Sequence, residues 1–393
     1  MPASTPDLFD VAVVGTGTAG LTAALGCSQA GLRVALIGPP ARRFAPSAEA
    51  PWDARIYALA PATVAEWQRL KVWPQVDAAR MQPAARMRIA GDAGGELVFD
   101  AWRAHATELA TIGEEGELLR VLPAACAFAP GVTALESNFE SMVVGADAAT
   151  IALADGRSLT ARLVVGADGA HSAVRAAAGI GARSEPYGQT AVVANFACAR
   201  PHEATAWQWF TDEGVVALLP LPGQAVSLVW SAPQALANEL AALAPAALAV
   251  RVQARSGGVL GELTPLGGSH AFALRKLTVD QLVGPRVALL GDAAHVVHPL
   301  AGQGLNLGQQ DVSELLRVLA ARESFRDPGD LVLLRRYARR RAEAIALMRG
   351  ATDGLARLFS ADDPLLRRLR NLGLSLVDAA APVKRALIGH AMG

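Results

Sequence analysis

The segment Val11-Ala-Val-Val-Gly15-Thr-Gly17-Thr-Ala-Gly20 determines the fold. It joins a short β-branched run, Val11 to Val14, to a glycine-rich turn, and an alanine- and leucine-rich stretch from Leu21 to Ala30 follows. This composition predicts a buried strand and then a helix, which Gly31 closes. Val34 to Ile37 predicts a second buried strand, so the chain is expected to begin with a βαβ unit whose two strands are parallel.

The three glycines of this segment have the spacing GxGxxG, which between a strand and a helix indicates a dinucleotide-binding site. Gly15 permits a tight turn, Gly17 lets the backbone approach a pyrophosphate, and Gly20 lets the helix pack closely on the strand. The N-terminus of the helix offers N–H donors to the anion.

An acid that holds the ribose hydroxyls is expected about 20 residues further on, but Gly38-Pro39-Pro40 stands there. Arg42 and Arg43 follow, and arginine favours the extra phosphate of NADP over an unmodified ribose. The first motif therefore leaves FAD and NADP open.

Two further motifs each follow an apolar strand. The segment Gly166-Ala-Asp168-Gly-Ala-His-Ser-Ala-Val-Arg175 comes after a predicted hairpin that turns at Asp155-Gly156. The longer segment from Gly291 to Asn306, GDAAHVVHPLAGQGLN, comes after the predicted strand Val287 to Leu290. Neither Asp-Gly nor Gly-Asp means much alone, so the argument rests on all three motifs and on their order.

Between the second and third motifs the sequence predicts an antiparallel sheet, with strands at Trp207 to Phe210, Val215 to Leu219 and Ala225 to Trp230. Helical composition covers Gln234 to Ala254, and after Gly304 the chain is expected to be mostly helical, with a break near Asp327-Pro-Gly329.

Composition excludes several classes of protein. The chain has 393 residues and equal numbers of basic and acidic side chains, 36 of each, so no global positive charge favours nucleic acid. The N-terminus does not resemble a signal peptide, and no apolar run reaches the roughly 20 residues that span a bilayer. A cytoplasmic protein is expected. The three cysteines, Cys27, Cys126 and Cys198, are predicted to be buried small hydrophobic residues rather than disulfide partners.

In this order the three motifs resemble the class A flavoprotein monooxygenases, and more specifically the ubiquinone-biosynthesis hydroxylases. The resemblance also includes Asp53-Ala-Arg-Ile-Tyr-Ala-Leu59, Tyr187-Gly-Gln189, Leu369-Arg-Asn-Leu-Gly-Leu374 and the extension of the third motif through GQQDV. It implies an α/β fold with a Rossmann-like FAD-binding domain (residues 1–72, 101–178 and 277–330). An antiparallel-sheet substrate domain (73–100 and 179–276) would be inserted into it, and a helical C-terminal region (331–393) would follow.

The resemblance also implies roles for individual residues. Gly15, Gly17 and Gly20 would approach the FAD pyrophosphate, Asp168 would lie near it, and Asp292 would bind the ribityl chain. The segment Pro299 to Asn306 would pass beside the flavin ring. Its cofactor contacts would be Gly302, Gln303, Gly304, Leu305 and Asn306. Arg55 and Arg120 would flank the cofactor, whereas Glu115-Gly116 replaces an amide or arginine of relatives.

The implied reaction is hydroxylation of an aromatic ring with O₂ and NAD(P)H, on a polyprenyl phenol of ubiquinone biosynthesis. A small soluble aromatic substrate and a non-catalytic subunit of a biosynthetic complex are the alternatives. The catalytic candidates are His298, as a proton-transfer group or as a packed histidine, and Pro299. No metal site is expected, because His295 and His298 have no further ligands nearby in the sequence.

Two apolar patterns have more than one interpretation. Trp207, Trp209 and Trp230 are interpreted as sheet core, or else as the lining of an aromatic substrate cavity. Leucines recur at helical spacing from Leu365 to Leu376 and are interpreted as docking against the body of the protein, or else as a peripheral contact with a membrane or partner.

Overall fold

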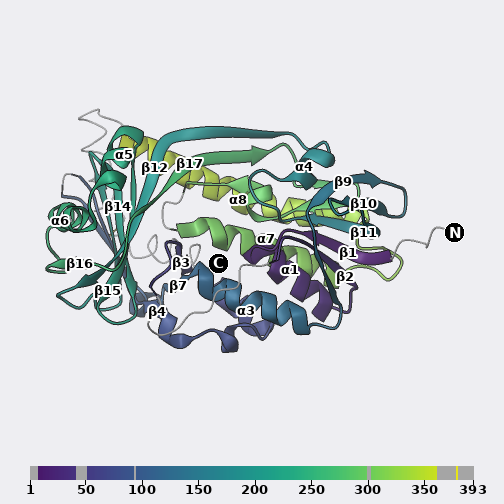
Figure 1. Cartoon of the computed structure of the whole chain (residues 1–393), viewed down its shortest axis with the longest axis horizontal. Helices are drawn as coiled ribbons and strands as arrows, with labels where there is room; N and C mark the ends of the chain where they lie inside the picture. The colour runs from purple at the N-terminus through teal and green to yellow at the C-terminus, as the bar shows by residue number, and fades with distance from the viewer. Residues whose placement is uncertain (1–7, 41–50, 93, 299–301, 361–377, 379–393) are drawn as a thin grey trace.

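The computed structural model describes residues 8–40, 51–92, 94–298, 302–360 and 378 (Figure 1). It begins with the predicted βαβ unit: strand β1 (Leu8–Val14), helix α1 (Thr18–Gln29) and strand β2 (Val34–Gly38). The two strands are parallel, with Val11 opposite Val34. Eight consecutive residues of α1, Gly20 to Cys27, are buried, which explains why the helix shows little amphipathic pattern in its sequence.

This unit is the centre of an eight-stranded sheet with the order β18-β19-β11-β1-β2-β8, to which β10 and β9 are added through β11. The strands not yet given are β8 (Val132–Glu136), β9 (Phe139–Val144), β10 (Ala149–Leu153), β11 (Ser158–Gly166), β18 (Val283–Gly284) and β19 (Val287–Leu289). The predicted hairpin is present as the antiparallel pair β10 and β11, and the predicted strand before the third motif is β19.

The second sheet has nine strands, with the order β20-β17-β12-β15-β14-β13-β5-β6 and β16 paired to β12. Its strands are β5 (Arg86–Ala90), β6 (Glu96–Asp100), β12 (Ala182–Cys198), β13 (Thr205–Thr211), β14 (Gly214–Leu221), β15 (Ala225–Pro233), β16 (Leu263–Pro265), β17 (His270–Val279) and β20 (His295–Val296). All pairs are antiparallel except β13 with β5. Figure 1 shows β12 and β17 extending from this sheet back across the first one.

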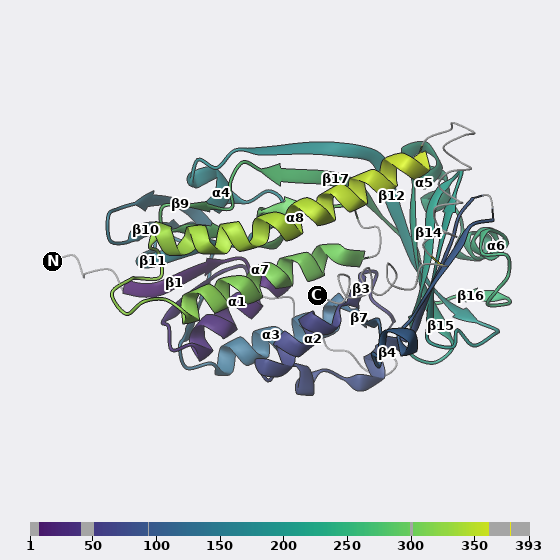
Figure 2. The ribbon, with the colours of Figure 1, turned by 180° about the vertical axis from the view of Figure 1, so that it is seen from behind.

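Helical composition from Gln234 to Ala254 corresponds to two helices rather than one, α5 (Gln234–Ala242) and α6 (Pro245–Arg255). Pro245 starts the second helix, because its ring fixes the φ angle and it has no N–H to donate. Both helices pack on the outer face of the second sheet, and the two views agree that α6 lies on the side away from the first sheet (Figures 1 and 2).

A three-stranded sheet lies between the two large ones. It consists of β3 (Ile56–Leu59), β7 (Ala110–Glu114) and β4 (Met81–Ala84), and α2 (Pro61–Arg69) and α3 (Glu115–Phe128) follow β3 and β7 in the chain. Helices α7 (Gln303–Ala320) and α8 (Leu331–Ser360) confirm the predicted helical end of the chain as far as the structure describes it. In Figure 2, α8 runs along both large sheets.

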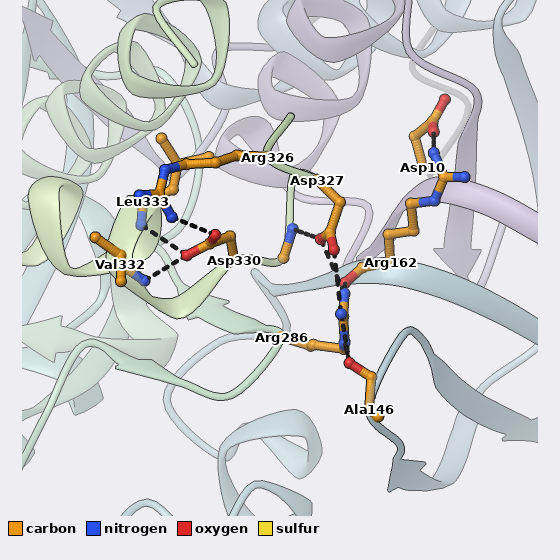
Figure 3. Close-up of polar contacts among 10 residues, drawn as sticks. Asp10, Ala146, Arg162, Arg286, Arg326, Asp327, Asp330, Val332 and Leu333 are labelled. Atoms are coloured by element: carbon orange, nitrogen blue, oxygen red, sulfur yellow. Dashed lines mark hydrogen bonds and ion pairs between the residues drawn. The ribbon is translucent and has the colours of Figure 1, made fainter. Parts of the chain in front are cut away.

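A buried arginine, Arg286, joins strand β11 to two loops (Figure 3). Arg286 adopts a left-handed φ of 58° and donates hydrogen bonds to the carbonyl oxygens of Ala146 and Arg162 and to the Asp327 carboxylate. Gly329 is needed beside it, because a Cβ atom there would lie 1.9 Å from the Arg162 oxygen. This cluster fixes the loop before α8.

The three cysteines are free and buried, in agreement with the sequence prediction. Burial raises the pKa of Cys27 and of Cys126 to about 12, so these thiols stay protonated and unreactive at neutral pH.

Candidate functional site

The three sequence motifs meet at one edge of the first sheet. Val14 pairs with Gly166 in the neighbouring strand, and Gly166 pairs with Leu289 in the next one. Because these strands are parallel, the turns that follow them lie side by side at their carboxyl ends. This is where open α/β sheets bind ligands.

The glycines of the first motif have different surroundings. A Cβ atom on Gly15 would lie 2.1 Å from the carbonyl oxygen of Ala167, and one on Gly20 would lie 2.1 Å from the oxygen of Gly15. A Cβ atom on Gly17 would meet no protein atom within 4 Å. Gly15 and Gly20 therefore allow backbone to approach backbone, whereas Gly17 leaves open space at the N-terminus of α1.

The second motif is held by its own polar side chains. The Asp168 carboxylate accepts hydrogen bonds from the Ser172 hydroxyl and from the backbone N–H groups of Ala173 and Val174. Arg175 donates to the carbonyl oxygens of Ala170 and Ala293, both at 2.9 Å, and so ties the second motif to the third. The Asp168 side chain thus faces its own loop, and its backbone neighbours Ala167 and Gly169 line the cavity described below.

A buried charge cluster supports the third motif from behind. Asp311 accepts hydrogen bonds from the backbone N–H of Gly291 at 3.0 Å and from Arg341 at 2.7 Å, and its carboxylate lies 2.7 Å from His295 Nε2. These partners hold the pKa of Asp311 below its usual value despite its complete burial. Asp311 therefore fixes the position of the Gly291-Asp292 turn.

The N-terminus of α7 is anchored by Asn306. Its side-chain oxygen accepts from the backbone N–H of Ala60 and from the Thr63 hydroxyl, and its amide nitrogen donates to the oxygen of Ala58 at 2.7 Å. Asn306 is thereby a structural link between α7 and β3. The chain around it, Gly302, Gly304 and Leu305, lines the cavity.

A cavity of about 700 Å³ lies between these motifs and the inner face of the second sheet. One end is lined by the turns of the first sheet, including Gly17, Gly169 and Asp292. The other end is lined mainly by apolar residues of the second sheet and of the small sheet, namely Met87, Ile89, Phe99, Leu109, Ile112, Val193, Val215, Ala217, Leu219 and Val229.

Three polar side chains form a linked group in the wall of this cavity. Arg55 lies 3.2 Å from the Glu115 carboxylate, and the Tyr57 hydroxyl donates to Glu115 at 2.9 Å. The Arg55 guanidinium also lies over the Phe272 ring, 5.3 Å from its centre. Burial raises the pKa of Tyr57, and the adjacent Glu115 carboxylate raises it further. In the sequence, Glu115 stands out only because it replaces an amide or arginine side chain of relatives.

Asp292 faces the same cavity. Desolvation by the surrounding protein raises its pKa, and the nearby Glu115 carboxylate acts in the same direction, while His295 and Arg55 oppose it. The cavity lining thus carries two carboxylates, Asp292 and Glu115, close to the Arg55 guanidinium.

Arg120, expected beside the cofactor, and His298, the catalytic candidate, are not among the residues that line the cavity in the described part of the chain. Arg120 pairs with buried Glu117 and donates to the carbonyl oxygen of Gln75. His298 is 1% exposed, its Nε2 atom lies 2.8 Å from the side-chain oxygen of Gln189, and its ring packs edge-on against Tyr187.

Burial lowers the pKa of His298 to about 4, so the imidazole is neutral at physiological pH. Its position fits the packed histidine, which was one of its two interpretations. Pro299 lies outside the described residues. Gln303 is the first residue of α7, and its side chain lies outside the described part as well.

Two of the three tryptophans belong to the core under α5 and α6 rather than to the cavity. Trp230 is completely buried there and Trp209 packs against it. Trp207 packs on the same core and also borders the cavity. The sheet-core interpretation therefore holds for Trp209 and Trp230.

Comparison with known families decides the class of the protein. A model of an FAD binding domain matches residues 119–351, more than half of the chain, and a second FAD binding domain model matches residues 10–42. The chain belongs to the FAD-dependent aromatic hydroxylases. FAD, and not NADP, is therefore the nucleotide of the GxGxxG motif, and NAD(P)H is the reductant used by this class.

Two relatives of this FAD-dependent hydroxylase match along almost the whole chain. Ubiquinone hydroxylase UbiL of Rhodospirillum rubrum is 36% identical over 402 aligned residues, covering 99% of this chain and 91% of the relative. The 3-demethoxyubiquinol 3-hydroxylase of Escherichia coli is 35% identical over 388 residues, covering 98% of both chains.

Solved structures share the fold. PqsL, a probable FAD-dependent monooxygenase from Pseudomonas aeruginosa, has a TM-score of 0.78 at 25% identity and covers 94% of this chain and 99% of its own. The p-nitrophenol 4-monooxygenase PnpA from Pseudomonas putida has a TM-score of 0.77 at 19% identity, over 98% and 99% of the two chains.

Within the described part of the hydroxylase, no helix is both long and apolar enough to cross a membrane. The same described residues contain no group of three or more His, Cys, Asp or Glu side chains that could hold a metal ion.

Proposed function

We propose that this protein hydroxylates the aromatic ring of a polyprenyl phenol in ubiquinone biosynthesis, using bound FAD, O₂ and NAD(P)H. The observation that carries the proposal is a cavity that joins the nucleotide-binding turns to a large apolar wall. Whole-length identity of 35–36% to two ubiquinone hydroxylases supports this choice of substrate.

The residues at the nucleotide end of the cavity fit FAD. The open space over Gly17 leaves room for the pyrophosphate, and α1 directs backbone N–H groups and the positive end of its dipole toward it. Arg55 would add a positive side chain, and Asp292 would accept hydrogen bonds from ribityl hydroxyls. Gly15, Gly20 and Asp168 would act through the backbone that they hold in place.

The N-terminus of α7 faces the middle of the cavity. Gly302 caps it with a left-handed φ of 65°, and the N–H groups of a helix's first turn favour negative charge nearby. When bound, the flavin supplies the redox chemistry by which an oxygen atom of O₂ reaches the ring. The chain would stabilise negative charge on the cofactor through this helix end.

The apolar wall would bind the substrate and exclude water. Side chains such as Ile89, Val215, Leu219 and Val229 would pack against the ring and the first part of an isoprenoid chain. A polyprenyl substrate is dissolved in lipid, so we propose a cytoplasmic protein that contacts the inner membrane peripherally. The leucine-rich segment considered for this contact, Leu365 to Leu376, lies outside the described residues.

The test is expression of the chain in a bacterium that lacks its own ubiquinone hydroxylase, followed by mass spectrometry of the extracted lipids. The proposal expects the polyprenyl phenol precursor to decrease and its product, heavier by one oxygen atom, to appear. The matched control is Gly17→Arg, which would fill the space over α1. Accumulation of unchanged precursor with the wild-type chain, when purified protein retains FAD, would contradict the assignment of substrate.

Assays of flavin content and NAD(P)H oxidation with the purified protein distinguish the proposed function from its two alternatives. Oxidation of NAD(P)H stimulated by a small soluble phenol, without activity on the polyprenyl phenol, would indicate the hydroxylase of a soluble aromatic. Absence of both flavin and any NAD(P)H oxidation would indicate a non-catalytic subunit, for which Gly38 and Glu115 are the two departures in the sequence.

A further inference from the structure

Gln208 is a polar side chain on the apolar inner face of the second sheet. Side chains alternate along β13, and Trp207 and Trp209 pack toward the core under α5 and α6. Gln208 therefore points to the opposite face, where it lines the cavity. Its cross-strand partners, Ala217 in β14 and Ile89 in β5, line the cavity too.

The amide of Gln208 has no hydrogen-bond partner in the part of the chain that the structure describes. The residue is only 5% exposed, and among the described residues no group donates a hydrogen bond to its side chain or accepts one from it. Its neighbours in the register row, Ile89, Ala217 and Val229, are all apolar. The amide atoms are open to the cavity rather than enclosed in the core, so water or a bound ligand is the hydrogen-bond partner that remains for them.

The surroundings restrict what the missing partner can be. The cavity is continuous from Gln208 to the nucleotide-binding turns, so a molecule that reaches the amide also lies in the space shared with the cofactor. Ser231 also lines the cavity, in the next register row opposite Val215. A ligand that fits this wall is mostly apolar and carries few polar atoms.

We propose that Gln208 orients the aromatic substrate by hydrogen-bonding to an oxygen atom attached to its ring. This inference deepens the proposed hydroxylase function and rests on it for the identity of the substrate class. A glutamine amide both donates and accepts, so it can bind the oxygen of a phenol or of a ring ether. The bond fixes the rotation of the ring in an otherwise non-directional apolar pocket, and Gln208 transfers no proton.

The test compares three probes on the FAD-loaded protein: 4-propylphenol, 4-propylanisole and propylbenzene. They share a ring and a propyl chain and differ in the group at the opposite ring position: a hydroxyl, a methoxy group or hydrogen. Binding is followed by the change in flavin absorbance and, independently, by calorimetry. We expect wild-type protein to bind the two oxygen-bearing probes more tightly than propylbenzene.

The variant is Gln208→Met, which keeps the length of the side chain and removes its polar atoms. We expect it to weaken binding of the phenol and the anisole about 3- to 10-fold, the usual effect of losing one neutral hydrogen bond, and to leave propylbenzene unchanged or tighter. Without ligand, the variant should unfold at about the same temperature, because the Gln208 amide makes no hydrogen bond to the described residues. Gln253→Met, on helix α6 outside the cavity, is the matched control.

The outcomes distinguish this inference from the proposed function. Equal affinities of wild type and Gln208→Met for the oxygen-bearing probes would overturn the role of Gln208, even if the enzyme hydroxylates its substrate. Failure of wild-type protein to prefer them over propylbenzene would overturn it too. Selective loss of oxygen-dependent binding in a protein that does not hydroxylate polyprenyl phenols would support Gln208 and reject the proposed substrate.

Discussion

Arg55 is paired with Glu115 inside the cavity, with 3.2 Å between Nη1 and a carboxylate oxygen. Asp292 adds a second carboxylate to the same wall. The two carboxylates oppose the attraction of Arg55 for the dianionic pyrophosphate of FAD. We expect Glu115→Gln to strengthen FAD binding about 3- to 10-fold, because it removes one like charge and frees Arg55 for the phosphate. Fluorescence titration of the apoprotein with FAD measures this.

The control is Glu66→Gln, which neutralises a carboxylate paired with Arg69 on α2. It should leave FAD affinity unchanged. Weaker FAD binding by Glu115→Gln would mean that the carboxylate itself holds a cofactor hydroxyl or that Arg55 needs it for its position.

Alanine in place of Gly17 should mainly weaken FAD binding, whereas alanine in place of Gly15 should mainly lower the stability of the fold. Gly17→Ala places a methyl group in open cavity space, so we expect a loss of stability of no more than about 1 kcal/mol but at least tenfold weaker FAD binding. Gly15→Ala combines a φ of 121° with a backbone clash, and we expect it to cost about 3 kcal/mol or more. Urea unfolding of the apoprotein, followed by FAD titration, separates the two effects. A Gly17→Ala variant with normal FAD affinity would show that the pyrophosphate lies elsewhere.

Thr16 fills the space in which a side chain at position 38 would begin. A Cβ atom on Gly38 would lie 2.9 Å from Thr16 Cγ2, and the Thr16 hydroxyl donates to the oxygen of Pro39. Restoring an acid by Gly38→Glu alone should therefore not improve FAD binding. The double variant Thr16→Ala with Gly38→Glu should bind FAD about tenfold more tightly, through hydrogen bonds to the ribose. Equal affinities of the single and double variants would show that Thr16 does not limit this site.

His298 should make the protein sensitive to acid. Its pKa is lowered from 6.5 to about 4 in the folded state by burial, although Asp353, which also binds Tyr187 and Lys276, opposes the shift. Between pH 6.5 and pH 4 the unfolded chain binds more protons, so the free energy of unfolding falls as the pH falls. The full effect is about 3 kcal/mol, reached near pH 4, and it is absent above pH 6.5.

His298→Gln keeps a donor to Gln189 and cannot titrate. Urea unfolding at pH 7 and pH 5 should show a decrease smaller by about 2 kcal/mol than that of wild type. His270→Asn, at an exposed position, should behave like wild type. An unchanged pH dependence in His298→Gln would contradict the buried, neutral imidazole.

The cluster around Arg286 should matter for stability and not for the cofactor. Its guanidinium binds two carbonyl oxygens and Asp327 while only about a tenth of the side chain is exposed (Figure 3). We expect Arg286→Met to lower the free energy of unfolding by about 3 kcal/mol, because two carbonyl oxygens and the partly buried Asp327 carboxylate lose their donor. Arg317→Met, which removes an exposed pair with Glu314, should cost about 0.5 kcal/mol or less. Unchanged FAD affinity in Arg286→Met would confirm that the effect is structural.

Several elements could be predicted from sequence because their causes are local. The strand before Gly15, the helix after Gly20 and the hairpin at Asp155-Gly156 follow from residue type and spacing over a few positions. The break at Pro245 is local as well, and giving that proline its usual meaning at a helix start would have divided the predicted helix correctly.

The directions of side chains near the site could not be predicted from the local sequence. Arg120 and His298 stand close to site motifs in the chain, but Glu117 and Gln189 bind them and hold them away from the cavity lining. Glu115 entered the prediction only as a mismatch. No local pattern indicates that it would meet Arg55 and Tyr57, which lie about 60 residues earlier.

The sequence by itself determined that a βαβ unit with a glycine-rich turn begins the chain, that two turns containing glycine and aspartate follow later strands, and that the family resembled uses FAD. These features rest on glycine's freedom of φ and on the periodicity of apolar residues, which act within short segments. Only the tertiary structure decided which side chains meet in the cavity. Gln208 faces it because β13 pairs with β5 and β14, and strands distant in sequence choose their partners and register through the packing of the whole sheet.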